Sequence, residues 1–302
     1  MLKKFIVKRD YHNSRFDRWF KHNVNHVPQS FIEKLIRKKN VKVNNKKIKT
    51  SFRLQFNDIV ELHGIDNLKD RVQSKTIKYK PSKKEKEEYG KFIIENNDNF
   101  IVINKPSGIP VQSGTKSFKN ITDLLKNSKY FEGSKPFIVH RIDKETSGIL
   151  IIAKNRKYAQ LFTSLFRIRK IHKTYLAIAH GQVDKNINLL QDNLLTYEKN
   201  KKIVQKAISY LKILNSNNKY SLLELKPITG RKHQLRKQLY NIGNPVVGDD
   251  KYFIKIQKNK LKNKNLMLHA YKLKFMINNI KYNFEAKYDY HFNNFIKKNI
   301  KS

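Results

Sequence analysis

The chain has 302 residues and a formal net charge of +41, from 65 Lys and Arg against 24 Asp and Glu. This length is enough for one or two hydrophobic cores, and the lack of cysteine excludes disulfides, thiolate metal sites and a cysteine nucleophile. The excess positive charge favours a polyanionic partner such as RNA or DNA, although an A+T-rich genome would also enrich lysine and raise the charge.

The sequence shows no signal for membrane insertion or export. No apolar run approaches the roughly 20 residues that a helix needs to cross a bilayer. The apolar part of the N-terminal MLKKFIVKRDYH is too short for a signal peptide. We therefore expect a cytoplasmic protein that does not bind a membrane, and we expect it to be a monomer.

Residues 14–62 have the pattern of a small α/β module. Four apolar residues at helical spacing predict one buried helix face: Phe16, Trp19, Phe20 and Val24. Ser30 and Glu33 form a capping-box pattern that predicts the start of a second helix. The run 41–43 with the turn at Asn44 and Asn45 predicts a hairpin, and residues 58–62 predict a closing strand.

The second predicted helix ends in three consecutive cations: Arg37, Lys38 and Lys39. A basic helix end beside a hairpin is a plausible RNA-binding surface. A solvated helix C-terminus is an equally good explanation, because cations are favoured there by the helix dipole. The order of elements resembles the small RNA-binding module of the S-four type, shared with a small-subunit ribosomal protein. RFDRWF, FIEKLIRKKNVKVNNKKIK and NDIVEL carry this resemblance.

Residues 64–90 are rich in charge and poor in apolar residues, which is typical of a linker or of a basic arm that lies on RNA. We therefore predict a small RNA-binding module at 1–63, a charged linker at 64–90 and a larger domain at 91–302.

The larger domain alternates short strands with a few helices. Strands are expected at 92–94, 100–103, 149–153, 173–181, 266–275 and 281–286, and residues 221–230 are expected to form a strand that leads into a turn. Helices are expected at 121–125, around residues 158–166 and around residues 235–242. Because most strands follow one another through short connections, we predict an α+β fold with a mixed, largely antiparallel sheet.

The most informative stretch is HRIDKETSG at 140–148. It is a polar turn between two apolar runs, 137–139 and 149–153, that are typical of buried strands. Asp143 follows Arg141 by two residues, and a nearby cation favours the charged form of a carboxylate. We therefore expect an ionised Asp143, suited to a nucleophile or general base. A structural Asp–Arg pair at a tight turn is the alternative for an isolated Arg-x-Asp.

Three further stretches accompany it: NKPSG at 104–108, Tyr175 within KTYLAIAHG, and PITGRKHQLR at 227–236. Together, in this order, the four strongly resemble the RluA family of RNA pseudouridine synthases. The resemblance covers roughly residues 92–290, includes LHAYKLKF, and is strongest in NKPSGIPVQSG to the RluC-like branch. An RluD-like or tRNA-directed enzyme is the alternative within the family.

The resemblance implies a cofactor-free isomerisation of uridine in RNA. The uracil leaves carbon 1′ of its ribose, turns, and is rejoined through its carbon 5. By position, Asp143 corresponds to the essential aspartate, and Tyr175 to the tyrosine that packs on the uracil and assists in removing the carbon 5 proton. Arg236 corresponds to the arginine that pairs with the aspartate, and Arg141 to an arginine near the flipped nucleotide.

Further residues of these motifs are expected to contact the RNA substrate: Lys105, His140, Arg231, Lys232, His233 and Gln234. Arg231 and Lys232 could instead form a solvated helix start, and His233 could fill a turn. Gln238 stands where the family often has a histidine, so this helix is expected to contact RNA differently.

Other functional classes fit less well. The chain has no phosphate-binding or dinucleotide-binding glycine motif, and Ser147 lacks the nucleophile elbow of a serine hydrolase. His140 and Asp143 have no further ligands at metal-binding spacing, so no metal is expected. A non-catalytic RNA-binding assembly factor remains the competing class. The N-terminal module favours large-subunit ribosomal RNA over tRNA as the partner.

Overall fold

The computed structural model describes residues 2–25, 27–65, 82, 85, 90–112, 119–126, 128–131, 135–198, 201–253 and 265–300. The chain divides into two compact units, residues 1–78 and 79–302. Most of the predicted linker 64–90 lies outside the described residues, so its boundaries and the alternative of a basic arm remain predictions.

In the N-terminal unit, two helices pack against a sheet with the strand order β1-β6-β3-β4 and a separate β2-β5 pair, among the residues described there. The elements are β1 (Leu2–Ile6), β2 (Ser14–Arg15), α1 (Phe16–Asn23), α2 (Gln29–Arg37), β3 (Val41–Val43), β4 (Lys46–Lys47), β5 (Arg53–Leu54) and β6 (Ile59–His63). The predicted apolar face of α1 is confirmed, because Phe16, Trp19 and Phe20 are buried in this unit's core.

The start of α2 differs from the predicted capping box. The helix begins at Gln29, its N-cap is Pro28, and no side chain caps it. Pro28 holds the extended backbone directly before the first turn, so Ser30 already lies within the helix. The hairpin that follows is as predicted, with Asn44 and Asn45 at positive φ in its turn.

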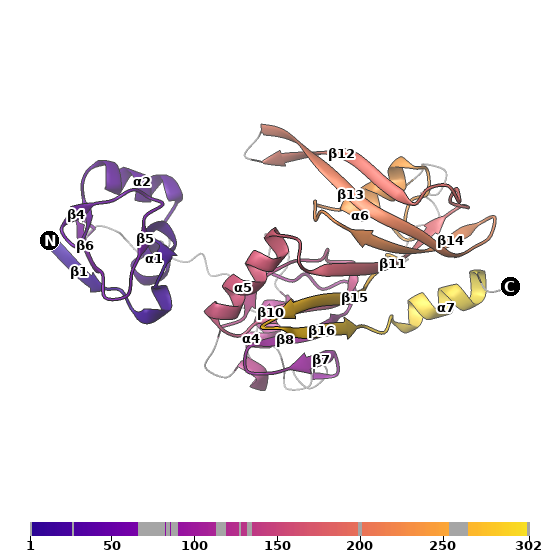
Figure 1. Cartoon of the computed structure of the whole chain (residues 1–302), viewed down its shortest axis with the longest axis horizontal. Helices are drawn as coiled ribbons and strands as arrows, with labels where there is room; N and C mark the ends of the chain where they lie inside the picture. The colour runs from indigo at the N-terminus through magenta and orange to yellow at the C-terminus, as the bar shows by residue number, and fades with distance from the viewer. Residues whose placement is uncertain are drawn as a thin grey trace. The chain divides into compact units, whose positions relative to one another are not determined.

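The second unit is built on one large sheet with the order β12-β13-β14-β11-β15-β10-β8-β7, where β16 pairs with β15 and β9 with β10 (Figure 1). Its strands are β7 (Ile93–Asn96), β8 (Phe100–Lys105), β9 (Phe137–Ile138), β10 (Ser147–Ala153), β11 (His172–His180), β12 (Leu189–Glu198), β13 (Lys201–Ser216), β14 (Tyr220–Pro227), β15 (Leu268–Ile277) and β16 (Ile280–Glu285). Its helices are α4 (Ile121–Lys126), α5 (Arg156–Arg167), α6 (Gln234–Asn241) and α7 (Tyr290–Asn299).

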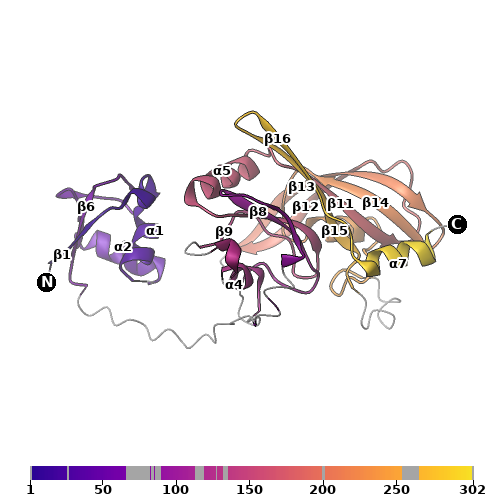
Figure 2. The same ribbon diagram turned by 90° about the horizontal axis from the view of Figure 1, so that it is seen from below.

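The predicted α+β class with a mixed, largely antiparallel sheet is confirmed. Among the named strand pairs of the described residues, only β10 with β15 is parallel. Helices cover both faces of β8, as Figure 2 shows for α5 and α4. Phe100 packs with Phe162 of α5, whereas its neighbour Ile101 packs with Leu124 of α4, as the alternation of a strand requires. The hairpin β12–β13 and helix α7 were not predicted.

The entry to β10 is fixed by close packing against β15. Gly148 has φ +106°, and a Cβ there would lie 2.3 Å from the carbonyl oxygen of Ala270, so only glycine fits. Ser147 and His269 Nδ1 lie 2.8 Å apart, and His269 Nε2 lies 3.0 Å from the carbonyl oxygen of Ala286. Because that carbonyl only accepts, His269 donates from Nε2 and Nδ1 accepts from the Ser147 hydroxyl. The loop preceding β10 therefore ends at a rigid point. The run 137–139 before that loop is half-buried rather than buried, since β9 is a short edge strand.

Candidate active site

Asp143 lies in the loop between β9 and β10, and a second loop holds that backbone in place. Ser107 Oγ donates to the carbonyl oxygen of Glu145 at 2.6 Å. The Gly108 amide donates to the carbonyl oxygen of Lys144 at 3.0 Å. NKPSG and HRIDKETSG, far apart in the sequence, therefore meet here. Fixing the two residues after Asp143 limits the directions in which its carboxylate can point.

Lys105 belongs to this clamp, and the RNA contact expected for it does not fit the structure. Its side chain is fully buried, and Nζ donates to the carbonyl oxygens of Pro106, Ile109 and Lys144 at 2.7, 2.9 and 3.0 Å. Burial lowers the pKa of Lys105 to about 7. With all three donor positions of the ammonium occupied, Lys105 joins the two loops and offers nothing to a phosphate.

His140 borders the site as a neutral side chain. Its Nε2 accepts a hydrogen bond from the Ile151 amide at 2.9 Å, and its ring stacks on Phe166 with centroids 4.6 Å apart. Burial, followed by the positive charge of Lys173, lowers the pKa of His140 to about 3. His140 therefore anchors the loop to β10 as a neutral side chain, and because it also lines the cavity described below, its contact with the RNA substrate stays a prediction.

Arg236 of α6 is the guanidinium that faces Asp143. Its Nε and Nη2 each donate to the buried carboxylate of Asp249 at 2.6 Å, and Nη2 also reaches Asp250 at 3.1 Å. Its remaining nitrogen, Nη1, lies 3.5 Å from Asp143 Oδ2. Burial opposes the charge, but the hydrogen bond and charge of Asp249 outweigh it and raise the pKa of Arg236. Asp249 thus aims Arg236 and prevents it from closing onto Asp143 as a bidentate pair.

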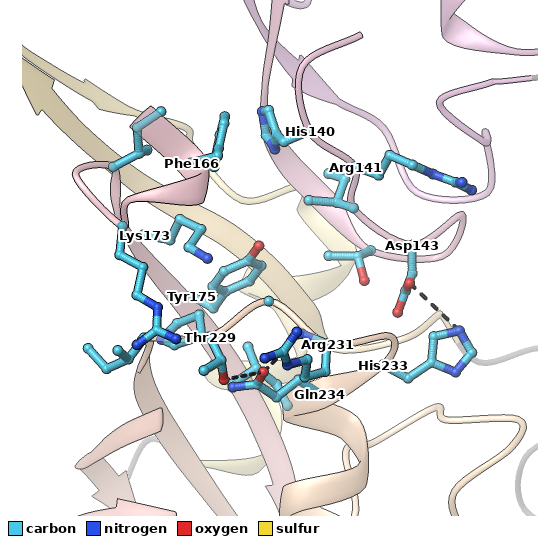
Figure 3. A pocket seen from close by; sticks show the side chains of 18 of the residues that line it. His140, Arg141, Asp143, Phe166, Lys173, Tyr175, Thr229, Arg231, His233 and Gln234 are labelled. Carbon is cyan, nitrogen blue, oxygen red and sulfur yellow. Dashed lines mark hydrogen bonds and ion pairs between the residues drawn. The ribbon is translucent and has the colours of Figure 1, made fainter. Parts of the chain in front are cut away.

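His233 approaches the other carboxylate oxygen. It is the N-cap of α6 with a left-handed backbone, and its Nε2 lies 3.7 Å from Asp143 Oδ1 (Figure 3). Its Nδ1 lies 2.9 Å from the hydroxyl of Tyr252. When that hydroxyl donates to Nδ1, the imidazole carries its proton on Nε2 and presents it to the carboxylate. Burial lowers the pKa of His233 although the charge of Asp143 raises it. His233 is therefore placed on Asp143 rather than on a phosphate.

Tyr175 lies on β11, between β14 and β15. It is paired with Leu225 on one side and Ala270 on the other, and a bulge between Thr174 and Tyr175 interrupts the register. The extra residue lies on β15, at Tyr271, so Lys173 and Tyr175 keep the alternation of β11. Burial, and then the negative charge of Asp143, raise the pKa of Tyr175, so its phenol carries its proton at neutral pH.

Asp143, Tyr175, His233 and Arg236 line one cavity of about 690 Å³. Asp143 from the β9–β10 loop, Tyr175 from β11 and Arg236 from α6 all line it, and Figure 3 shows Asp143 and Tyr175 on its walls. This volume lies within the range of small-molecule and cofactor sites, roughly 300–1,000 Å³. The cavity can therefore enclose a single nucleoside whose base lies near the Tyr175 ring.

Arg141 and Arg231 also line the cavity, as expected for substrate contacts. Arg141 is exposed, and the ion pairs that the structure gives Asp143 are with His233 and Arg236. The cation beside Asp143 therefore comes from α6 and not from the neighbouring Arg141. Arg231 donates through Nε to the carbonyl oxygen of Lys206 at 3.2 Å, which leaves its Nη groups for a substrate.

The other predicted contacts on this segment have different places. Lys232 is exposed and does not line the cavity. Gln234 is buried, and its amide is used within the protein, with Oε1 accepting from Thr229 Oγ1 and Nε2 donating to the Ile208 carbonyl oxygen. Gln234 holds the turn before α6 and also lines the cavity, so its contact with the substrate stays a prediction. Gln238 is fully buried, so this side chain makes no RNA contact itself, and a different RNA contact by α6 stays a prediction.

The N-terminal unit carries the remaining predicted contacts: Arg37, Lys38 and Lys39. All three side chains are exposed at the end of α2, and Lys39 has a left-handed backbone. Their contact with RNA remains a prediction.

Three residues near the site were missed by the sequence interpretation: Lys173, Asp249 and Tyr252. Asp249 had one signal, since an acidic pair directly after a turn is unusual in so basic a chain. Lys173 precedes Tyr175 by two residues, so strand alternation alone could have placed it on the same face. Tyr252 had no signal.

Within the described part of the chain, no group of three or more His, Asp or Glu is placed to hold a metal ion. Its helices are also too short or too polar to span a membrane.

Comparison with known proteins identifies the family. The family model for RNA pseudouridylate synthase matches residues 99–241, and the S4 domain model matches residues 25–60. The chain is 36% identical over 256 residues to the ribosomal large subunit pseudouridine synthase C of Rickettsia felis, which covers 80% of this chain and 82% of that protein. The chain belongs to the RNA pseudouridine synthases.

Other similarities agree. The synthase is 31% identical over 287 residues to the ribosomal large subunit pseudouridine synthase C of Haemophilus ducreyi, covering 90% of this chain and 87% of that protein. The solved structure of human RNA pseudouridylate synthase domain containing 4 matches with a TM-score of 0.61 and 26% identity, over 70% of this chain and 94% of that chain. Family, fold class and isomerase activity predicted from the sequence are therefore confirmed.

Proposed function

We propose that this synthase converts specific uridines of large-subunit ribosomal RNA into pseudouridine, with Asp143 as the nucleophile. The observation that carries the proposal is the place of the Asp143 carboxylate, in a cavity that Tyr175 also lines and 3.5 Å from the fixed guanidinium of Arg236. The printed names of the Rickettsia and Haemophilus relatives support ribosomal RNA as the substrate. We assign residues 1–63 to RNA binding, 64–90 to a linker and 91–302 to catalysis.

The geometry supports a division of labour among the three residues. A uridine within folded RNA must leave its stack before a carboxylate can reach it, and an aromatic ring replaces the stacking that is lost. Tyr175 supplies that ring, and its raised pKa makes it a protonated phenol in the resting enzyme. Asp143 has a partly exposed side chain, so an oxygen can reach the nucleotide while Arg236 and His233 hold the group in place.

The net reaction exchanges one glycosidic bond for another, and any bond that the Asp143 carboxylate forms as nucleophile is broken again before the product leaves. The bond between N1 of uracil and carbon 1′ breaks, the base turns within the cavity, and carbon 5 joins carbon 1′. Carbon 5 then loses its proton and N1 gains one, so the reaction balances without a cofactor. We place the synthase in the cytoplasm with its ribosomal RNA substrate, and we expect a monomer in sedimentation experiments.

The test is chemical mapping of pseudouridine in deproteinised large-subunit ribosomal RNA after incubation with the purified full-length protein. The wild type is expected to create discrete new sites, and Asp143→Asn none. Sites that appear in tRNA but not in ribosomal RNA would contradict the proposed substrate. Tight RNA binding by both proteins without any new site would favour the competing class, a non-catalytic RNA-binding factor.

A further inference from the structure

The cavity has a second wall whose charge the proposed chemistry does not use. Lys173 lies two residues before Tyr175 on β11, and Arg167 and Arg169 lie at the end of α5 and in the turn after it. All three line the cavity. Asp143 is the only carboxylate among the described residues that line it, and its ion pairs are with Arg236 and His233. The second wall is therefore positively charged, next to the Tyr175 ring that is proposed to bind the base.

Lys173 is held in this wall without a counter-charge. Its side chain is half-buried, and burial followed by the positive charge of Arg169 lowers its pKa. Among the described residues, Nζ of Lys173 makes no hydrogen bond or ion pair. It lies near Gly230 in the turn before α6, 3.8 Å from the place that a Cβ of residue 230 would take. Lys173 and Arg169 line the same cavity, so their like charges repel across a partly desolvated place, and a bound anion would relieve that repulsion.

We propose that Lys173 and Arg169 form a phosphate subsite, which binds the RNA backbone next to the flipped uridine. This rests on the proposed function, because the anion is part of the RNA whose uridine enters the cavity. In the view of Figure 3, Tyr175 lies between Lys173 and Asp143. Two residues of a strand span about 7 Å, a spacing comparable with the ribose that separates a base from its phosphate.

The chemistry of the two side chains favours a phosphate over the base itself. The Arg169 guanidinium is exposed at the rim, where a backbone phosphate would pass, whereas Lys173 lies deeper. A guanidinium grips phosphate oxygens with paired donors, and an ammonium adds a compact charge. A uracil carbonyl carries no net charge and would leave two adjacent cations uncompensated.

Two substitutions can remove the charges without disturbing the fold. Lys173→Met keeps the length of the side chain and removes a partly buried charge. Arg169 has φ +59°, a left-handed backbone that Asn adopts more readily than other residues, so Arg169→Asn removes the guanidinium at little conformational cost. Lys173→Arg keeps the charge. Lys219→Met is the matched control, because Lys219 is exposed in the turn before β14 and does not line the cavity.

The experiment measures the dissociation constant of a large-subunit ribosomal RNA transcript at several salt concentrations, by filter binding with the full-length protein, together with kcat for pseudouridine formation. Loss of one phosphate contact is expected to make the slope of log affinity against log salt shallower by roughly 0.7–0.9. Lys173→Met and Arg169→Asn should each show this change and bind roughly ten-fold more weakly at low salt. Lys173→Arg and Lys219→Met should keep the wild-type slope.

The double variant and the kinetics give the decisive outcomes. If both residues bind one phosphate, the double variant is expected to lose little more affinity than either single variant. A Lys173→Met variant with an unchanged slope and a reduced kcat would overturn the subsite and place Lys173 on the base. Absence of turnover by the wild type on ribosomal RNA would contradict the proposed substrate, whereas the slopes would still test the subsite.

Discussion

The surroundings of Asp143 and the basic end of α2 use charge in opposite ways. Around Asp143, Arg236 is 3% exposed and is fixed by the fully buried Asp249, so each charge has a defined partner and direction. At the end of α2, the three cations Arg37, Lys38 and Lys39 are exposed to solvent. Catalysis needs a carboxylate positioned within a fraction of an ångström. Burial of Arg236 and Asp249 provides that precision, because each side chain is held in one orientation. Binding to a polyanion depends mainly on how many cations are available.

The largest effect is expected from removing the proposed nucleophile. Asp143→Asn keeps the shape of the side chain and should lower kcat by at least about 10⁴-fold, while the dissociation constant for RNA stays near the wild-type value. Single-turnover mapping of pseudouridine and filter binding measure the two quantities separately. Comparable losses of activity and affinity would instead mean that Asp143 positions the RNA.

The next largest effect concerns the residue that aims Arg236. Asp249→Asn removes the charge that fixes the guanidinium and leaves Arg236 partly unpaired inside the protein. We expect a loss of about 3 kcal/mol in the free energy of unfolding and a fall in kcat of roughly 10²-fold. Denaturant titration and initial rates measure these changes.

Asp250→Asn is the matched control for that prediction. Asp250 contacts the same nitrogen of Arg236 at 3.1 Å, but its side chain is 69% exposed. Its loss should change the free energy of unfolding by less than about 1 kcal/mol. Equal effects of the two variants would show that burial does not decide which carboxylate aims the arginine.

At the other region, changes should affect binding and leave the chemistry intact. Replacing Arg37, Lys38 and Lys39 together by Gln is expected to weaken RNA binding roughly ten-fold and to make its salt dependence shallower, with kcat at saturating RNA unchanged. Exchanging Arg and Lys at the same three positions keeps the charge and should keep the affinity. A lowered kcat with normal affinity would show that this end of α2 orients the substrate and does more than attract it.

The effect expected last, because it is absent at neutral pH and develops only in acid, is a pH dependence of stability at His140. Its pKa of about 3 in the folded protein lies below the usual value of an unfolded histidine, roughly 6.5, so the unfolded state takes up the proton first as the pH falls. Its contribution to stability is therefore complete above pH 6.5 and is lost towards pH 3, by at most about 1.4 kcal/mol per pH unit. Urea titrations of the wild type and His140→Asn should converge in this range, whereas the exposed His172→Asn should follow the wild type throughout. Parallel curves for all three would contradict the prediction.

Much of the fold could be predicted because local pattern and turn chemistry agree. The apolar spacing of α1, the Asn44–Asn45 turn and the apolar run 149–153 of β10 are all properties of short windows of sequence. The hairpin β12–β13 was missed because its exposed face also carries large apolar side chains, among them Leu195, Val204 and Tyr210, so apolar and polar residues do not alternate cleanly along the strands. The start of α2 was misplaced because Pro28 sets the backbone before the predicted cap residue can act.

The sequence by itself determined the family, the α+β class and the residues Asp143, Tyr175 and Arg236 as members of one site. The four motifs identify the family and the site because their residue types, and their order along the chain, can be read directly from the sequence. The tertiary structure alone decided which groups touch. It buries Lys105 against three carbonyl oxygens, turns Gln234 inward and places Asp249 behind Arg236. Contacts between β8, α6 and the loops around them depend on packing between segments that are far apart in the sequence. A local sequence pattern therefore does not show which cation is buried and which is exposed to solvent.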